Sequence, residues 1–303
     1  MMNNERNERR DKEFKRVMSL SPDVAEKEFF EHDFNPPVSW SEGIYLIMLM
    51  CAMFPSVNDA TSFMEINPEY LYRFISCVGN QWQAILNAGM ALISAHHTTK
   101  VKSFFASKGL RNIFIPTRTI TEQEETFWSM FFFNHNISER EFFDALHKWI
   151  FMTDTKKNTL WLYGPPNSGK SFLAAQIIHP FEKSIGVISN QGILNEFALS
   201  HLLQSSLLLW EEPFTDVGVA QDMKNVLGGK PIAVPMKYNV RQVLNRKPIL
   251  ITSNYEDLTQ GVNASFLELD ALNKRRFMFT MTYKPIFNFQ VPADSLWQYL
   301  LTK

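Results

Sequence analysis

The chain has 303 residues, of which 45% are hydrophobic and 20% are charged, and it includes 26 Phe and 7 Trp. This composition is that of a folded protein with a sizeable core, and it excludes an intrinsically disordered chain. The formal net charge is -1, so the average surface field does not attract phosphate and any contact with nucleic acid must come from a local basic patch.

Residues 1–35 are polar and charged and end at Asn35-Pro36-Pro37, so we expect a flexible or loosely docked leader. Because residues 1–17 lack an apolar signal core, we expect an intracellular protein that is not secreted. A basic cluster in this leader fits either a nuclear import signal or a solvated charged arm. The cluster consists of Arg9, Arg10, Lys12, Lys15 and Arg16.

Residues 36–154 show the apolar spacing of helices, and we interpret them as a helical domain. Asn67-Pro68 and Gly109 mark breaks between helices, and Ser138 with Glu141 predicts a capping box at the start of a further helix. The most apolar run, Ile44 to Phe54, is shorter than the roughly 20 residues that a bilayer crossing needs. We therefore expect a buried helix there and no membrane partner.

Cys51 and Cys77 are the only cysteines, and neither belongs to a pair or to a Cys/His cluster with metal-ligand spacing. We expect two buried thiols and neither a structural zinc nor a disulfide. The one histidine cluster, His96-His97, is followed by Thr-Thr and is interpreted as structural or incidental.

After Asp154 short runs rich in Leu, Ile and Val alternate with helical stretches, which is typical of a mostly parallel sheet flanked by helices. The sequence therefore predicts an α/β P-loop NTPase domain over residues 155–285, followed by a C-terminal tail over residues 286–303. The predicted strands are Thr159–Tyr163, Ile185–Ser189, Ser206–Trp210, Ile232–Val234 and Pro248–Thr252.

The first of these strands leads into Gly164-Pro-Pro-Asn-Ser-Gly-Lys-Ser171, and a helix is predicted from Phe172. This is a complete G-x-x-x-x-G-K-S loop, in which backbone N–H groups and the helix N-terminus face phosphate oxygens. We expect Lys170 to bridge the β- and γ-phosphates of ATP and the Ser171 hydroxyl to hold Mg²⁺. The expected nucleotide-binding residues are Gly164, Pro165, Pro166, Asn167, Ser168, Gly169, Lys170 and Ser171.

Two further buried strands end in polar residues. The run Leu207-Leu-Leu-Trp-Glu211-Glu212 presents adjacent carboxylates where ligands bind in an open α/β sheet. We expect Glu211 to hold Mg²⁺ through water, and Glu212 to orient and deprotonate the attacking water. Asn254 follows the strand that begins near Pro248 and is expected to act as a sensor of the γ-phosphate and the lytic water.

Between the carboxylates and Asn254 the sequence predicts a two-stranded hairpin with Lys237 and Tyr238 near its tip. An ammonium group suits a phosphate and an aromatic ring suits a sugar or base, so this tip is a candidate contact for a nucleic-acid strand. The alternative is an exposed hairpin with no special role. Further basic residues are expected around the tip, namely Arg241, Arg246 and Lys247.

Together these motifs resemble those of superfamily 3 helicases, most closely the Rep and large non-structural proteins of parvoviruses. The resemblance covers roughly residues 158–281, and it implies an ATPase of AAA+ type that moves 3′ to 5′ on single-stranded DNA as a hexameric ring of identical subunits. Residues 36–154 would then include a helical collar that helps the ring assemble. The family resemblance also implies that the protein acts in the host nucleus, with other viral replication proteins as candidate partners. In that family, hairpins with a lysine at the tip line the central channel of the ring, and Lys237 matches this lysine.

By the same resemblance, Arg275 in Ala271-Leu-Asn-Lys-Arg275-Arg-Phe-Met-Phe279 falls where the family places its arginine finger, which acts in the ATP site of the neighbouring subunit. Arg276 stays an alternative, and so does a basic surface turn over residues 274–276. Family members usually carry an upstream endonuclease with a His-hydrophobic-His motif. The pair His96-His97 does not match that motif, so these histidines give no reason to assign nuclease activity.

We interpret the chain as the motor of an ATP-dependent viral DNA helicase that uses ATP and Mg²⁺ and translocates on single-stranded DNA during genome replication. Two alternatives stay open, a P-loop kinase of a small molecule and a non-catalytic nucleotide-binding scaffold derived from a viral helicase. RNA also stays open as the substrate. Stimulation of ATP hydrolysis by single-stranded DNA discriminates among these functions.

Overall fold

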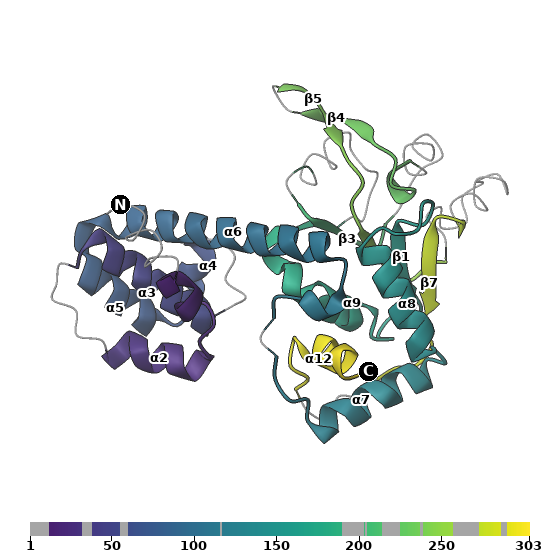
Figure 1. Cartoon of the computed structure of the whole chain (residues 1–303), viewed down its shortest axis with the longest axis horizontal. Helices are drawn as coiled ribbons and strands as arrows, with labels where there is room; N and C mark the ends of the chain where they lie inside the picture. The colour runs from purple at the N-terminus through teal and green to yellow at the C-terminus, as the bar shows by residue number, and fades with distance from the viewer. Residues whose placement is uncertain are drawn as a thin grey trace. The chain divides into compact units, whose positions relative to one another are not determined.

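The chain forms two compact units, Met1–Thr99 and Lys100–Lys303 (Figure 1). The structure is a computed structural model that describes residues 12–31, 38–54, 60–115, 117–189, 203, 205–213, 225–236, 239–256, 273–285 and 290–303. Within these ranges, none of the helices has the length and apolar character that a membrane crossing requires.

The first unit is helical, as predicted. Its apolar run forms α3, which begins at a capping box of Ser39 and Glu42, and the predicted break at Asn67 caps α5. Both cysteines are buried free thiols, which confirms that prediction. The helices are α2 (Pro22–Glu31), α3 (Trp40–Met53), α4 (Ala60–Glu65), α5 (Pro68–Val78), the short 3-10 helix η1 (Gly79–Gln81) and α6 (Trp82–Ser107), whose last residues belong to the second unit.

The second unit contains a five-stranded parallel sheet with strand order β2-β3-β6-β1-β7 and a separate antiparallel hairpin of β4 and β5. The predicted α/β fold with a mostly parallel sheet is thereby confirmed. The strands are β1 (Thr159–Tyr163), β2 (Ile185–Ser189), β3 (Leu207–Glu211), β4 (Ile232–Met236), β5 (Asn239–Leu244), β6 (Ile249–Ser253) and β7 (Arg276–Thr280). The helices are η2 (Leu110–Asn112), α7 (Glu122–Asn134), α8 (Glu139–Ile150), α9 (Lys170–Ile178), η3 (His179–Ser184) and α12 (Ser295–Thr302).

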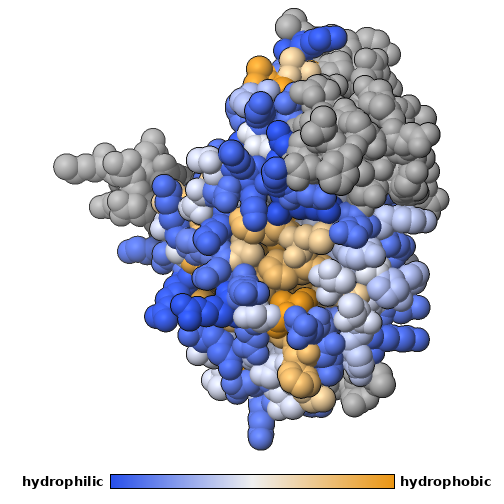
Figure 2. Space-filling view, turned by 90° about the vertical axis from the view of Figure 1, so that its right-hand side faces the viewer, coloured by the Kyte–Doolittle hydropathy of each residue, from blue (hydrophilic) through white to orange (hydrophobic). Residues whose placement is uncertain are grey.

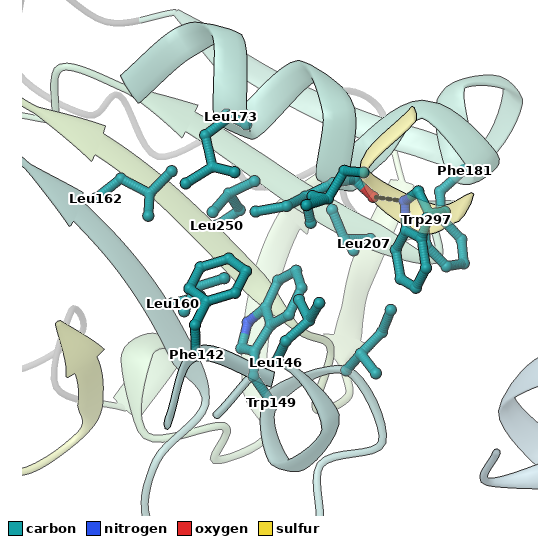
Figure 3. Packing of buried hydrophobic residues seen from close by; sticks show 14 of the residues in the cluster. Phe142, Leu146, Trp149, Leu160, Leu162, Leu173, Phe181, Leu207, Leu250 and Trp297 are labelled. Atoms are coloured by element: carbon teal, nitrogen blue, oxygen red, sulfur yellow. Dashed lines mark hydrogen bonds between the residues drawn. The ribbon is translucent and has the colours of Figure 1, made fainter. Parts of the chain in front are cut away.

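Side chains from the sheet and from helices α8, α9 and α12 share one buried core (Figure 3). Trp149 of α8 donates its indole N–H to the carbonyl oxygen of Ile249 at 2.9 Å, which ties α8 to β6. Trp297 of α12 donates to the carbonyl oxygen of Gln176 at 2.9 Å, which ties α12 to α9. The indole N–H groups of Trp149 and Trp297 therefore both have acceptors, and each bond holds its helix against a neighbouring element.

This core explains two differences from the expected domain boundaries. Helices α7 and α8 contribute Trp128, Phe142 and Trp149 to the same core as the sheet, so the compact unit begins at residue 100 and not near residue 155. The expected C-terminal tail, residues 286–303, contains α12, which buries Trp297 and Tyr299 in that core. Sequence periodicity showed the helices but not which core they join.

Arg118 links the start of α7 to the start of α12. Its guanidinium group donates to Glu124 at 2.5 Å and to Asp294 at 2.9 Å. Glu124 is almost completely buried and also completes a capping box with Thr121. The hydrogen bond from Arg118 is the main reason why the pKa of Glu124 falls to about 2.

We predict that Arg118→Ala lowers the free energy of unfolding by about 2 kcal/mol at pH 7, because it leaves the Glu124 carboxylate buried without its cation. The folded-state pKa of Glu124 lies below its ordinary value, so this stabilisation is present above pH 4.5 and is lost as the pH falls toward about 2. Urea denaturation at several pH values, with the exposed Arg140→Ala as control, measures both effects. An equal loss for the two variants at pH 7 would contradict the prediction.

Candidate functional site

Three neighbouring strands bring the predicted site residues to one edge of the sheet. In the parallel pairing of β1 with β6, Tyr163 lies opposite Ser253, and in that of β3 with β6, Glu211 lies opposite Thr252. The predicted phosphate-binding loop, Glu212 and Asn254 each follow directly on the end of one of these strands. Motifs that are far apart in the sequence are therefore adjacent, and the strand that carries Asn254 lies between the other two.

The loop over residues 164–169 has a backbone that requires glycine at both ends. Gly164 has φ +156°, and a Cβ atom there would lie 2.0 Å from the carbonyl oxygen of Met281, a backbone atom. Gly169 has φ +86° and is the N-cap of α9. A side chain at Gly164 would collide with the segment that follows β7, so this glycine serves close backbone packing as well as the turn.

Lys170 is 6% exposed and its ammonium group is held inside the loop. Its Nζ donates to the carbonyl oxygens of Gly164 and Pro165, each at 2.8 Å, and to Oδ1 of Asn254 at 2.9 Å. Burial lowers the pKa of Lys170, and the negative charge of Glu212 opposes this shift. The cation predicted to bind phosphate is thus joined directly to the predicted sensor.

Glu212 continues this chain of contacts. Its Oε2 accepts the backbone N–H of Asn254 at 3.0 Å, and its own N–H donates to the carbonyl oxygen of Thr252 at 2.8 Å. The backbone of Glu212 has φ +45°, a conformation that costs a non-glycine residue free energy and that is concentrated at functional sites. Lys170, Asn254 and Glu212 therefore form one hydrogen-bonded group, with the half-buried Glu211 beside it on β3.

A cavity of about 440 Å³ opens over the loop and the first turn of α9. This volume lies within the range of small-molecule sites. Ser168, in the cavity lining, is 1% exposed, and no described residue forms a hydrogen bond with its hydroxyl oxygen. The lining residues are Asn167, Ser168, Gly169, Lys170, Ser171, Phe172, Lys284 and Pro285. The charged members of this set are two lysines, so the cavity suits an anionic ligand with polar atoms.

Arg275 and Arg276 have different environments. Arg276 is 7% exposed, its guanidinium group lies 4.4 Å from the ring centroid of Trp161, and it donates to the carbonyl oxygen of Glu256. Arg276 therefore has a structural role, as a cation–π contact within the fold. Arg275 is half-buried, and its carbonyl oxygen accepts the backbone N–H of Asn158 at 3.0 Å, at the start of β1. It lies at the opposite end of that strand from the phosphate-binding loop.

The predicted hairpin is present as β4 and β5. Its expected tip residues, Lys237 and Tyr238, lie outside the described residues. The expectation that Arg246 and Lys247 belong to a basic area around the tip is wrong, because both side chains bind the backbone elsewhere: Arg246 donates to the carbonyl oxygen of Lys157 and Lys247 to that of Leu203. Burial lowers the pKa of Lys247 to about 8.

No sequence motif marks the segment after β7 or His135, although the segment contacts the loop and His135 binds the segment. Met281 and Pro285 pack against the two glycines of the loop, and Lys284 lines the cavity. His135 accepts the backbone N–H groups of Thr282 and Tyr283 on Nδ1, each at 3.1 Å. These residues carry no motif: the pairing of β7 with β1 brings the segment to the loop, and the end of α7 brings His135.

The family described as parvovirus non-structural protein NS1 matches residues 80–285. The initiator protein NS1 of human parvovirus B19 (isolate AU) is 33% identical over 153 residues, which are 48% of this chain and 22% of that protein. Protein Rep52 of adeno-associated virus 2 is 27% identical over 138 residues, which are 44% of this chain and 34% of that protein. The match to the solved structure of JCV helicase covers 81% of this chain and 78% of the helicase chain, with 13% identity and a TM-score of 0.47. This likeness is too distant to carry an argument.

We predict that Gly164→Ala lowers the free energy of unfolding by about 1–3 kcal/mol, because the new methyl group must displace the backbone at Met281. Gly79→Ala is the matched control, since Gly79 also has a positive φ, +68°, but has no atom within 4 Å of the added Cβ. The control therefore measures the backbone cost alone, about 1 kcal/mol. Equal losses for the two variants in urea denaturation would refute a steric role for Gly164.

Proposed function

This chain belongs to the parvovirus non-structural protein NS1 family, and from that membership we propose that it is the ATP-hydrolysing motor of a DNA helicase that acts in viral genome replication. The aligned segment spans only 22% and 34% of the two relatives, so the proposal concerns a motor and not every activity of such proteins. Family membership favours this function over a small-molecule kinase.

The observation that carries the proposal is the hydrogen-bonded group of Lys170, Asn254 and Glu212 at the edge of the sheet. A phosphate-binding lysine, an amide and a carboxylate are the groups that nucleoside triphosphate hydrolysis requires. A chance P-loop would not place the other two within hydrogen-bond distance of each other. The cavity beside the loop, with cations and the buried Ser168 hydroxyl, fits the phosphates of a nucleotide.

Each side chain has a proposed role in hydrolysis. Lys170 exchanges the loop carbonyls and Asn254 for phosphate oxygens, which releases the Asn254 amide to orient the attacking water. Glu212 accepts a proton from that water. Ser171 and Glu211 would hold Mg²⁺, which neutralises phosphate charge when bound and typically takes only one or two protein ligands. The nucleotide would be cradled by residues 164–171.

We propose that Arg275 acts on the neighbouring subunit. Within its own chain it precedes Arg276, the partner of Thr159, so it lies six residues along β1 from Gly164, roughly 20 Å at about 3.3 Å per residue. That separation is too long for an arginine side chain to span. Arg275 immediately precedes β7, an edge strand of the sheet, and from such an edge it can reach a second copy.

Self-association into a ring has support from the surface of the second unit. Figure 2 shows apolar residues gathered on one face and surrounded by hydrophilic ones. The large exposed apolar side chains of this unit include Met130, Phe133 and Met278, and Phe133 is 82% exposed. Exposed apolar areas of this kind mark interaction sites. The number of subunits, six in the proposed ring, follows from the family resemblance alone.

We further propose that the tip of the β4–β5 hairpin, with Lys237 and Tyr238, contacts single-stranded DNA. The support is the hairpin itself: β4 ends at Met236 and β5 begins at Asn239, so these two residues lie between the paired strands in the sequence. A lysine binds phosphate and a tyrosine stacks on sugar or base. Action in the nucleus of the host cell, with other viral replication proteins, is proposed from the family alone.

Strand displacement on tailed DNA and RNA duplexes, with ATP and Mg²⁺, tests the proposed function, and Glu212→Gln sharpens it. We expect the variant to bind ATP but to hydrolyse it roughly 100-fold or more slowly and to unwind no duplex, because an amide is a far weaker base than a carboxylate. The exposed Glu256→Gln is the control and should behave as wild type. Loss of ATP binding in Glu212→Gln would assign Glu212 to the metal or to the fold instead.

Arg275→Ala should bind ATP normally and lose most ATP hydrolysis, since the missing charge belongs to the neighbour's site. Mixing it with Glu212→Gln should restore part of the activity, because some interfaces then join an intact Glu212 to an intact Arg275. Phosphate release across a series of mixing ratios measures this, and Lys274→Ala controls for loss of a neighbouring charge. An absence of rescue at every ratio, with assembly confirmed by sedimentation, would count against action between subunits.

A further inference from the structure

The segment 281–285, here called the strap, crosses the phosphate-binding loop and is fixed there at both ends. Met281 donates its backbone N–H to the carbonyl oxygen of Tyr163 at 2.6 Å, and its own carbonyl oxygen fills the space left by the absent side chain of Gly164. At the other end, Pro285 Cγ would lie 3.0 Å from a Cβ atom on Gly169. The strap is therefore packed against both glycines of the loop.

His135 holds the middle of the strap. Its Nδ1 accepts the backbone N–H groups of Thr282 and Tyr283, which requires that nitrogen to be unprotonated. Burial of His135 lowers its pKa to about 4, so the acceptor is available at neutral pH. The His135 ring also contacts Phe131, which lies 3.2 Å from a Cβ atom placed on Gly169. The backbone on either side of Lys284 is thus set by the fold.

Lys284 extends from this strap at the cavity, and its surroundings are those of an anion site. It lines the cavity together with Lys170, and no carboxylate is found among the described residues of the lining. Ser168, in the same lining, has a buried hydroxyl with no hydrogen-bond partner in the described part of the chain. Two cations and an unsatisfied hydroxyl around one cavity indicate a polar, negatively charged ligand.

We propose that Lys284 is a second nucleotide-binding lysine, which contacts the α- and β-phosphate side of the bound nucleotide. This inference rests on the proposed function of the loop. We assign the α- and β-phosphate side from the residues that line the cavity. They include Ser171 and Phe172 of the first turn of α9. Glu211, Glu212 and Asn254 are not among the described residues of this lining. Those three residues lie where hydrolysis is proposed, so Lys284 acts on nucleotide affinity.

Binding of ADP and of a non-hydrolysable ATP analogue to the full chain, with Mg²⁺, tests this by isothermal titration calorimetry. Lys284→Ala should raise the Kd of both ligands by the same factor, about tenfold, the loss of one charge-assisted hydrogen bond. Lys284→Arg should keep most of the affinity. Lys148→Ala removes an exposed lysine on α8 and should leave both Kd values unchanged. Equal melting temperatures of the wild-type chain and the three variants would show that the substitutions leave the fold intact.

Three outcomes would overturn the assignment. An unchanged Kd in Lys284→Ala means that this lysine does not bind nucleotide. A raised Kd for the ATP analogue alone places Lys284 on the γ-phosphate and refutes the α- and β-phosphate side. If the wild-type chain binds neither ligand, both this inference and the proposed function fail. Binding that depends on Lys170 and not on Lys284 leaves the proposed function intact and rejects only this inference.

Discussion

The in-register parallel pairing of β3, β6 and β1 positions every other part of the candidate site. It sets Tyr163 opposite Ser253 and Glu211 opposite Thr252, so the residues that follow each strand emerge side by side. Strands buried on both faces hold this register, because a slip of one residue would exchange the faces of all their side chains. The same slip would also carry Asn254 away from Lys170.

The second constraint is competition for the Lys170 ammonium group. It is bonded to two loop carbonyls and to the Asn254 side chain, while Asn254 is bonded through its backbone to Glu212. A ligand that draws Lys170 onto phosphate must therefore release the Asn254 amide. Occupancy of the proposed phosphate site and the freedom of the proposed water-positioning amide would thus be linked through one side chain.

The sequence predicts the elements that carry a local motif or a local apolar pattern, and it does not predict contacts between residues that are distant in the chain. The phosphate-binding loop and β1 follow from a contiguous motif, and β3 and β6 begin within one residue of the predicted strands. Strand β7 alternates between buried and exposed residues at the sheet edge and pairs with β1 more than 100 residues earlier, so nothing in its pattern predicts the partner. Lys284 follows β7 and His135 follows α7, so both lie near the loop through contacts between distant parts of the chain, and the backbone acceptors of Arg246 are likewise distant from it in sequence.

The central claim is that ATP bound at Lys170 powers movement on single-stranded DNA. Its most direct test is the rate of ATP hydrolysis with and without single-stranded DNA, measured for the wild-type chain and for Lys170→Ala. We expect that DNA accelerates hydrolysis by the wild-type chain and that Lys170→Ala hydrolyses no ATP in either condition, since the loop has lost its charge on the β- and γ-phosphates. Undiminished hydrolysis by Lys170→Ala, or a wild-type rate that DNA does not change, would contradict the central claim.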